Sequence, residues 1–130
     1  VFSPYDYLKK IKSITKKNGI IIFTTLTNDV IDLSLLNKQS TQILPPHHIN
    51  FISIKGFQLL SKRLKLKLLD IKTPGKMDID ILKNNMHLIE SKNYKLFLNF
   101  IYQNKLEKKF QNFIQSNKRS SHIWVYLRNE

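Results

Sequence analysis

The stretch NGIIIFTT, residues 18–25, decides the fold. Asn-Gly is a pair that often ends a helix, and the residues after it are β-branched or aromatic without polar alternation. A strand that is apolar on both faces is typical of a sheet between two layers of helices, as in parallel α/β proteins. We therefore expect a helix that ends at Asn18-Gly19 in a left-handed cap, followed by a buried strand over residues 20–25.

The segment before this strand has the pattern of a helix. Ser3 suits the N-cap, Pro4 the first helical position, and Asp6 the negatively charged first turn. Leu8 and Ile11 belong to an apolar stripe at helical spacing. A helix that leads directly into a buried strand is the most informative local pattern in the chain.

Two later segments are predicted strands. Residues 66–72 partly alternate between apolar and polar side chains, which favours a strand near a sheet edge. Residues 121–128 are rich in β-branched and aromatic side chains, so we expect a strand there as well.

Two helices are expected between the first two strands. Ser53 is the predicted N-cap of one of them. A short helix is expected after Asn28 or Asp29. The carboxylates of Asp29 and Asp32 follow the first strand, and we expect them to lie in solvent, with a position facing a pocket as the alternative.

Residues 78–116 have helical periodicity, and we expect Asp78 to be the N-cap where this region begins. Its aromatic side chains allow two interpretations. Such a stripe usually belongs to the core, and the alternative is that it lines an acceptor pocket or a groove for a partner. These aromatic residues are Tyr94, Phe97, Phe100, Tyr102, Phe110 and Phe113.

Length and composition limit the class of protein. A chain of 130 residues with 42% hydrophobic residues suits one folded domain. It contains no cysteine, which excludes a disulfide scaffold, a thiolate zinc site and a cysteine nucleophile. The longest uncharged apolar run, residues 20–23, is too short to cross a bilayer, and no signal-peptide pattern is present. We therefore expect a cytoplasmic protein.

The net charge of +13 has two interpretations. It either marks a surface that binds a polyanion, or it is a solvated surface whose lysines reflect an A/T-rich genome. Nineteen of the 22 cationic residues are lysine, and only three are arginine. Arginine provides the two-pronged hydrogen bonding that sites for bases and phosphates favour, so nucleic acid is not the partner we expect first.

Five short segments carry a resemblance to a known family. They are PYDYLKKI at residues 4–11, KNGIII at 17–22, HINFIS at 48–53, TPGKMD at 73–78 and SHIWV at 121–125. In order and spacing they resemble the C-terminal half of class I S-adenosylmethionine-dependent methyltransferases of the small-molecule type. The resemblance covers nearly the whole chain.

The resemblance implies a partial Rossmann-like fold, with residues 1–130 forming a single domain. The strand order of the family is 3-2-1-4-5-7-6, and residues 20–25, 66–72 and 121–128 would be strands five, six and seven. The expected fold class is thus α/β, with a three-stranded mixed sheet of order 5-7-6 flanked by helices. Its last strand would be central and antiparallel, and residues from about 78 to 118 would form a helical insertion.

The resemblance also implies an activity. The family binds its cofactor mainly through its N-terminal half, whereas none of the three glycines here belongs to a G-x-G pattern. The chain would thus be the acceptor-side half of a methyltransferase whose S-adenosylmethionine is bound by residues upstream of Val1. Alone it would be inactive and bind no cofactor. The acceptor would be a small molecule, for example a sugar or a glycan precursor. The alternative is a non-catalytic basic module that binds nucleic acid or another polyanion.

His48, which matches the histidine of the family, is the first candidate for a general base or a residue that positions the acceptor. His47 is the second candidate. Asn50, Phe51 and Asp29 are candidates for substrate binding, because the family has this stretch at the carboxyl rim of its sheet. Alternatively, an imidazole caps the helix that follows or binds loop carbonyls. Adjacent histidines diverge in an extended chain, so no metal site is predicted.

The first strand has a further implication for association. In the family, strand four pairs with strand five, and this chain has no counterpart of strand four. An apolar unpaired edge is a template for pairing with another chain. We therefore expect the isolated chain to self-associate through residues 20–25.

Overall fold

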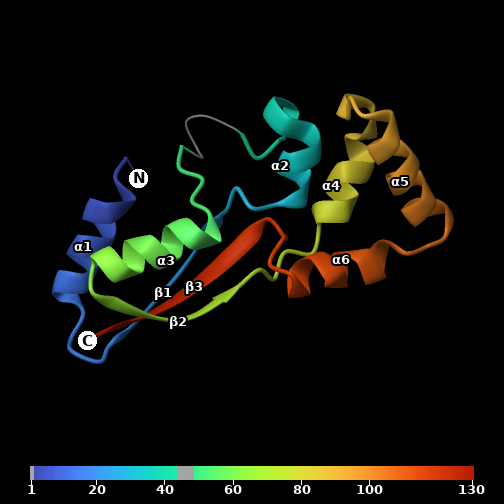
Figure 1. Cartoon of the computed structure of the whole chain (residues 1–130). Coiled ribbons are helices and arrows are strands. Elements are labelled where there is room, and N and C mark those ends of the chain that lie inside the picture. The colour runs from blue at the N-terminus through green and yellow to red at the C-terminus, as the bar shows by residue number, and fades with distance from the viewer. Residues whose placement is uncertain (1, 44–48) are drawn as a thin grey trace.

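A computed structural model describes residues 2–43 and 49–130 of the chain. Three strands form one sheet, and helices lie on one of its faces and beyond one of its ends (Figure 1). The described elements are, in order, α1 (Pro4–Ile14), β1 (Ile20–Leu26), α2 (Ile31–Leu36), α3 (Ile54–Arg63), β2 (Leu66–Lys72), α4 (Asp78–Asn84), α5 (Lys92–Gln103), α6 (Glu107–Ser116) and β3 (His122–Asn129). Short 3₁₀ turns, Asn37–Gln39 and Met86–Leu88, follow α2 and α4. The expected α/β class is confirmed.

The sheet has the strand order β1-β3-β2. β3 runs antiparallel to both neighbours, with Thr24 of β1 and Lys72 of β2 on either side of Trp124. The expectation of a mixed sheet is therefore wrong for the described strands. β1 and β2 point the same way but are not neighbours, so both sets of backbone hydrogen bonds are antiparallel.

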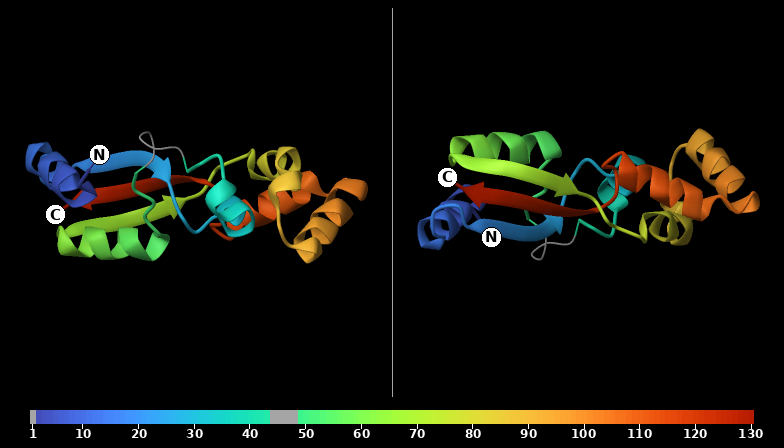
Figure 2. Two further views of the ribbon diagram at one scale, coloured as in Figure 1. Left: turned by 90° about the horizontal axis from the view of Figure 1, so that it is seen from above. Right: turned by 90° about the horizontal axis from the view of Figure 1, so that it is seen from below.

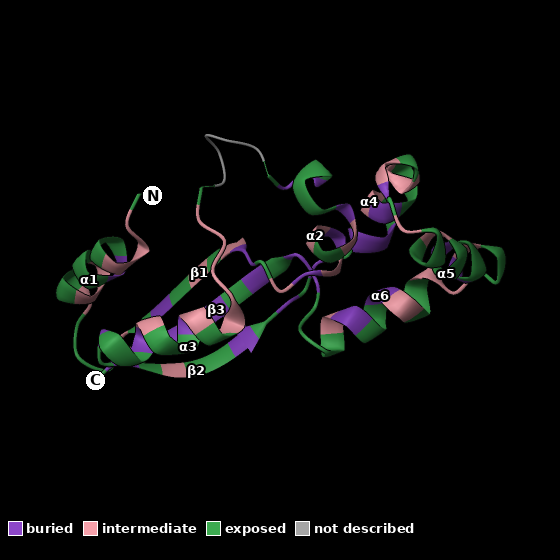
Figure 3. Cartoon of the chain, turned by 45° about the horizontal axis from the view of Figure 1, so that its top comes forward, coloured by how far each residue is buried: buried purple, intermediate pink, exposed green. Residues whose placement is uncertain are grey.

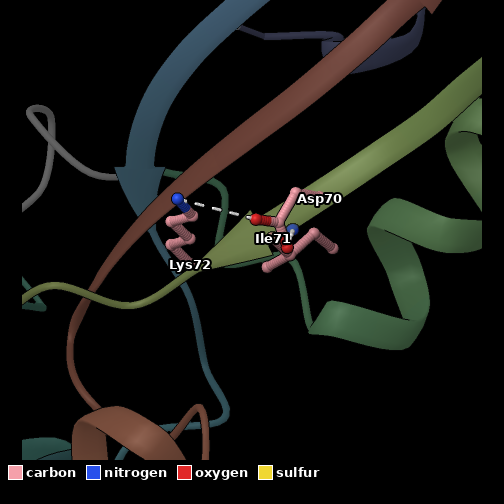
Figure 4. A network of polar contacts seen from close by, with 3 residues as sticks. All are labelled: Asp70, Ile71 and Lys72. Atoms are coloured by element: carbon pink, nitrogen blue, oxygen red, sulfur yellow. Dashed lines mark hydrogen bonds and ion pairs between the residues drawn. The ribbon is translucent and has the colours of Figure 1, made fainter.

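A β-bulge in β2 explains why its sequence alternates only in part. Leu68 pairs with Leu127, and the next pair is Asp70 with Tyr126, so Leu69 is the extra residue. The carboxylate of Asp70 accepts a hydrogen bond from the Ile71 backbone N–H at 2.8 Å and lies 3.8 Å from the ammonium of Lys72 (Figure 4).

Helices α1 and α3 cover one face of the sheet (Figures 1 and 2). Their buried apolar side chains pack on the inward residues of all three strands. The buried residues of this first core cluster are Leu8, Ile21, Phe57, Leu64, Leu66, Ile71, Ile123, Val125 and Leu127. Lys12 of α1 also donates from its ammonium to the Leu64 carbonyl at 2.8 Å and to the Lys65 carbonyl at 3.1 Å. A cation at this position stabilises the C-terminal end of α3.

The opposite face of the sheet carries no helix in the part of the chain that the structure describes (Figure 2). Ile20 and Ile22 are 51% and 57% exposed there, and Trp124 is 43% exposed. The expectation that the first strand is buried on both faces is wrong, because only one of the two layers of helices is present. Antiparallel sheets commonly have one face in water, but exposed isoleucine and tryptophan side chains on that face are typical of an interface.

The two ends of α1 differ in how well the sequence predicted them. The Ser3 hydroxyl accepts from the Asp6 backbone N–H at 3.2 Å, as an N-cap should. The helix ends at Ile14, however, before the predicted Asn18-Gly19 cap. Of this pair, Asn18 has a left-handed backbone, with φ of 62°, and Gly19 does not. Gly19 is needed for space instead, because a Cβ atom there would lie 2.6 Å from the Thr15 methyl carbon.

A second core cluster lies beyond the end of the sheet, among α2, α4, α5 and α6 (Figure 1). Its buried residues are Leu36, Ile79, Leu82, Ile89, Leu98 and Ile114. Several aromatic side chains expected in this core are instead at the surface (Figure 3): Tyr94, Phe97, Phe100 and Phe113 are exposed, and Tyr102 and Phe110 are half-buried. The apolar stripe on α5 and α6 is therefore wider than the part of each helix that is buried in the second core cluster.

A fully buried carboxylate, that of Asp78, joins this helical region to the sheet. Its Oδ1 accepts from the Ser121 backbone N–H at 2.7 Å, and its Oδ2 accepts from the Ser120 hydroxyl at 2.6 Å and the Gln111 amide at 2.7 Å. The expectation that Asp78 caps its own helix is wrong, because the carboxylate binds the start of β3 instead. Gly75 fits the same site, where a Cβ atom would overlap the Ser120 hydroxyl.

We expect Asp78→Asn to lower the free energy of unfolding by about 2 kcal/mol, because the amide NH₂ would face one of these three donors. Urea unfolding monitored by Trp124 fluorescence would measure the change. Asp80→Asn, an exposed position on the same helix, is the matched control and should change stability little. Equal stability of the two variants would contradict the role given to Asp78.

Candidate acceptor site

A pocket of about 340 Å³ lies between the start of α1, the second half of β1 and the segment that leads into α3. Its lining is mostly apolar and aromatic, with the two threonine hydroxyls of β1 and one amide. The lining residues are Pro4, Tyr7, Leu8, Phe23, Thr24, Thr25, Ile49, Asn50, Ile52 and Phe57. The rings of Phe23 and Phe57 lie 5.7 Å apart at a tilt of 53°. Such a lining suits a small organic molecule with an apolar part and a few hydroxyl groups.

Hydrogen bonds hold the walls of this pocket together. The Thr27 hydroxyl, just after β1, donates to the Ile52 carbonyl at 2.9 Å. Ile54 is the first residue of α3, and its backbone N–H donates to the Asp29 carboxylate at 2.8 Å. Ser53 is the N-cap, as predicted, and accepts from the Gly56 N–H at 2.9 Å. A carboxylate and a hydroxyl therefore satisfy backbone donors at one helix start.

The structure brings some of the predicted site residues together. Asn50 lines the pocket, and Phe51 beside it is half-buried and does not line the pocket. Asp29 is half-buried, and its carboxylate binds the start of α3. His47 and His48 lie outside the described residues, so their roles stay predictions.

Sequence reasoning missed most of the pocket lining. Tyr7 projects from α1, while Thr24 and Thr25 come from the strand and Phe57 from α3. One signal was available, because the polar pair Thr24-Thr25 ends an otherwise apolar strand. No local signal pairs α1 with α3, since residues about 50 positions apart become neighbours only through the sheet.

The pocket has few groups that exchange protons. Among the described residues that line it, Tyr7 is the only one with a titratable side chain. In residues 2–43 and 49–130, no three His, Asp or Glu side chains gather as a metal site. The described lining can therefore bind and orient a molecule, and a general base would have to come from a neighbouring segment.

A second cavity, of about 430 Å³, lies between α4 and α6. Its lining is polar and carries charges of both signs, with Lys76, Asp80, Glu107 and Lys108 among its residues. Beside it, burial raises the pKa of Tyr102 to about 12, with a further increase from the charges of Glu107 and Asp80. The Tyr102 hydroxyl donates to the Ile79 carbonyl at 3.1 Å. This phenol therefore acts as a structural donor.

A second fully buried carboxylate, that of Asp32, lies in α2 just after the pocket wall. Its Oδ2 accepts from the Ser40 hydroxyl at 3.0 Å and from the Gln42 amide at 2.6 Å, while its Oδ1 has no partner among the described residues. The expectation of a solvated carboxylate after the first strand is wrong for this residue. Burial raises the pKa of Asp32, and these two hydrogen bonds oppose the increase.

Comparisons of the chain with protein-family models, with curated proteins and with solved structures find no match. Among the described residues, no helix combines the length and apolar character needed to cross a membrane. The function therefore has to be argued from the geometry of this chain.

We expect Asp32→Asn to stabilise the protein at pH 8, because the amide cannot ionise in this buried site. A folded pKa above the unfolded value gives stability that is present in acid and is lost as the pH rises through the folded pKa. The advantage of the variant should therefore shrink as the pH falls toward 4.

Urea unfolding at pH 8 and pH 5 would measure this advantage. Asp78→Asn is the matched control, since Asp78 is equally buried but accepts hydrogen bonds on both oxygens. It should lower the free energy of unfolding at pH 8, where Asp32→Asn raises it. The explanation fails if Asp32→Asn is the less stable of the two at that pH.

Proposed function

We propose that the chain is the acceptor-side, C-terminal half of a class I S-adenosylmethionine-dependent methyltransferase that acts on a small molecule. The observation that carries the proposal is the sheet. β3 lies between β1 and β2 and is antiparallel to both. This is the arrangement that the family has for its strands five, seven and six, so the short motifs and the topology agree.

The bare face of the sheet supports the same proposal. An α/β sheet of this family has helices on both faces, and here α1 and α3 occupy the same one (Figure 2). The other face exposes Ile20, Ile22 and Trp124. An N-terminal half would add a strand beside β1 and helices over these side chains, which would remove apolar surface from water.

The pocket at the end of β1 is the proposed acceptor site. Methyl transfer is an in-line displacement, in which the protein mainly orients the acceptor toward the methyl group that the cofactor supplies. Thr24, Thr25 and Asn50 offer hydrogen bonds to hydroxyl groups, and the aromatic residues exclude water. His48 is two residues from Asn50 in the sequence and is the proposed general base, with His47 as its alternative. Phe51 follows Asn50 and is proposed to support the pocket wall without lining the pocket. Asp29 acts by holding the pocket wall to α3.

The test begins with the coding sequence upstream of Val1, which we expect to encode a strand and a Gly-rich turn. A protein extended to include that region should bind S-adenosylmethionine in calorimetry, and the 130-residue chain should not. An extended protein with His48→Ala should keep this binding and lose methyl transfer. Extended protein without affinity for S-adenosylmethionine would overturn the proposal. Salt-dependent binding of the chain to heparin would then favour the basic-module alternative.

The isolated chain should self-associate through β1, whose outer edge has no partner strand in the described residues. Sedimentation velocity at rising concentration should show dimers or larger species. Ile22→Lys should reduce them, because a lysine opposes pairing at a strand edge. Leu59→Lys, at an equally exposed position on α3, is the control. A monomer at every concentration would contradict this prediction.

A further inference from the structure

Helix α5 and one end of α6 lie at the end of the molecule farthest from the two termini (Figure 1). Both helices have exposed apolar side chains. Leu96 and Phe100 are one helical turn apart and are 67% and 55% exposed, and Phe113 of α6 is 59% exposed. Phe110 connects the two helices, because its ring lies 5.5 Å from that of Phe97 and 6.1 Å from that of Phe113. We call these five side chains the α5–α6 patch.

The charges around the α5–α6 patch are positive. Lys92 precedes Leu96 by one helical turn, Lys109 precedes Phe113 by one turn, and Lys105 lies in the connection between the helices. Residues 91–106 contain no Asp or Glu, and the carboxylate of Glu90, which is exposed just before α5, is outnumbered by these lysines. The nearest carboxylate in the sequence after them, that of Glu107, is turned toward α4, where it lies 4.0 Å from the ammonium of Lys83.

We propose that the α5–α6 patch docks on an anionic lipid surface. Its side chains are phenylalanine and leucine, which have no hydrogen-bonding groups and partition into the boundary between head groups and acyl chains. The surrounding lysines would lie at the level of the anionic head groups, and each such lysine adds to the attraction. Helices that carry apolar side chains bordered by lysines are typical of proteins that lie on a membrane without crossing it.

Other occupants fit the α5–α6 patch less well. A second copy of the chain would bring the same lysines face to face, and like charges oppose such pairing. Protein interfaces are enriched in phenylalanine but depleted in lysine. The lysines that border the patch therefore favour an anionic lipid surface over a partner protein. Single-stranded nucleic acid stacks on aromatic rings, but the aliphatic Leu96 offers no such surface. A hydrocarbon boundary accepts all five.

The experiment is co-sedimentation of the 130-residue chain with vesicles of phosphatidylcholine alone or with one quarter phosphatidylglycerol. We expect binding to the anionic vesicles that weakens with salt, and little binding to the neutral ones. The double variant Phe100→Ser with Phe113→Ser should bind about tenfold more weakly. The control is the double variant Leu59→Ser with Ile14→Ser, at two exposed apolar positions on α3 and α1. This control should bind the vesicles as the original chain does.

A second pair of variants separates the patch from the net charge of the chain. Lys92→Glu with Lys109→Glu removes positive charge at the α5–α6 patch, and both positions lie in first helical turns that accept a glutamate. Lys9→Glu with Lys55→Glu changes the net charge equally on α1 and α3. Only the first pair should lose vesicle binding.

Three outcomes would overturn the proposal. The first is equal vesicle binding by the chain and the Phe100/Phe113 variant. The second is equal loss in both lysine pairs, which would indicate net charge alone. The third is a Phe100/Phe113 variant that loses affinity for an oligo(dT) strand but not for vesicles, which would assign the patch to nucleic acid. None of these outcomes bears on S-adenosylmethionine binding, so the two proposals can fail separately.

Discussion

The fold depends on the pairing of β3 with two strands at once. In the described sheet β1 and β2 are not neighbours, and each is held in the sheet by its backbone hydrogen bonds to β3. Its two ends are also fixed by side chains: the carboxylate of Asp78 binds the residues that lead into the strand, and the Asn129 amide donates to the carbonyls of Lys12 and Thr15 at 3.3 and 2.6 Å. The helical region and α1 are therefore both positioned by the same strand.

The two buried aspartates show how the same residue type serves different ends in one fold. Asp78 has a donor for each oxygen, so its charge is compensated by hydrogen bonds and the site is tightly specified. Asp32 leaves one oxygen without a partner among the described residues, and burial disfavours its charged form. The first carboxylate joins two parts of the chain, and the second destabilises the fold where it is ionised.

The strands and the first helix start could be predicted because their signals are local. Continuous β-branched runs predicted β1 and β3 to within a residue or two, and Ser3 with Pro4 predicted the start of α1. Exposure could not be predicted in the same way. Periodicity shows that a helix has an apolar stripe, but the width of the stripe that becomes buried depends on neighbours far away in the sequence, as Phe100 and Phe113 show.

The candidate site was predictable only in part for the same reason. Asn50 was found from its motif, whereas Tyr7 and Phe57 join the pocket through packing that no short segment encodes. The bare sheet face was also beyond sequence reasoning, because an isoleucine run looks the same whether a strand has one covering layer or two. Hydrophobicity records what a segment is able to bury, and the tertiary partners decide what it does bury.

The position of the central strand has a consequence for biosynthesis. Because β3 is the last element that the structure describes, the ribosome completes β1 and β2 before it makes the strand that pairs with both of them. Residues 27–121 are translated after β1 is complete and before β3 begins. The hydrogen bonds of β1 and β2 with β3 therefore cannot form until residues 122–129 have left the ribosome, so this sheet is completed late in synthesis.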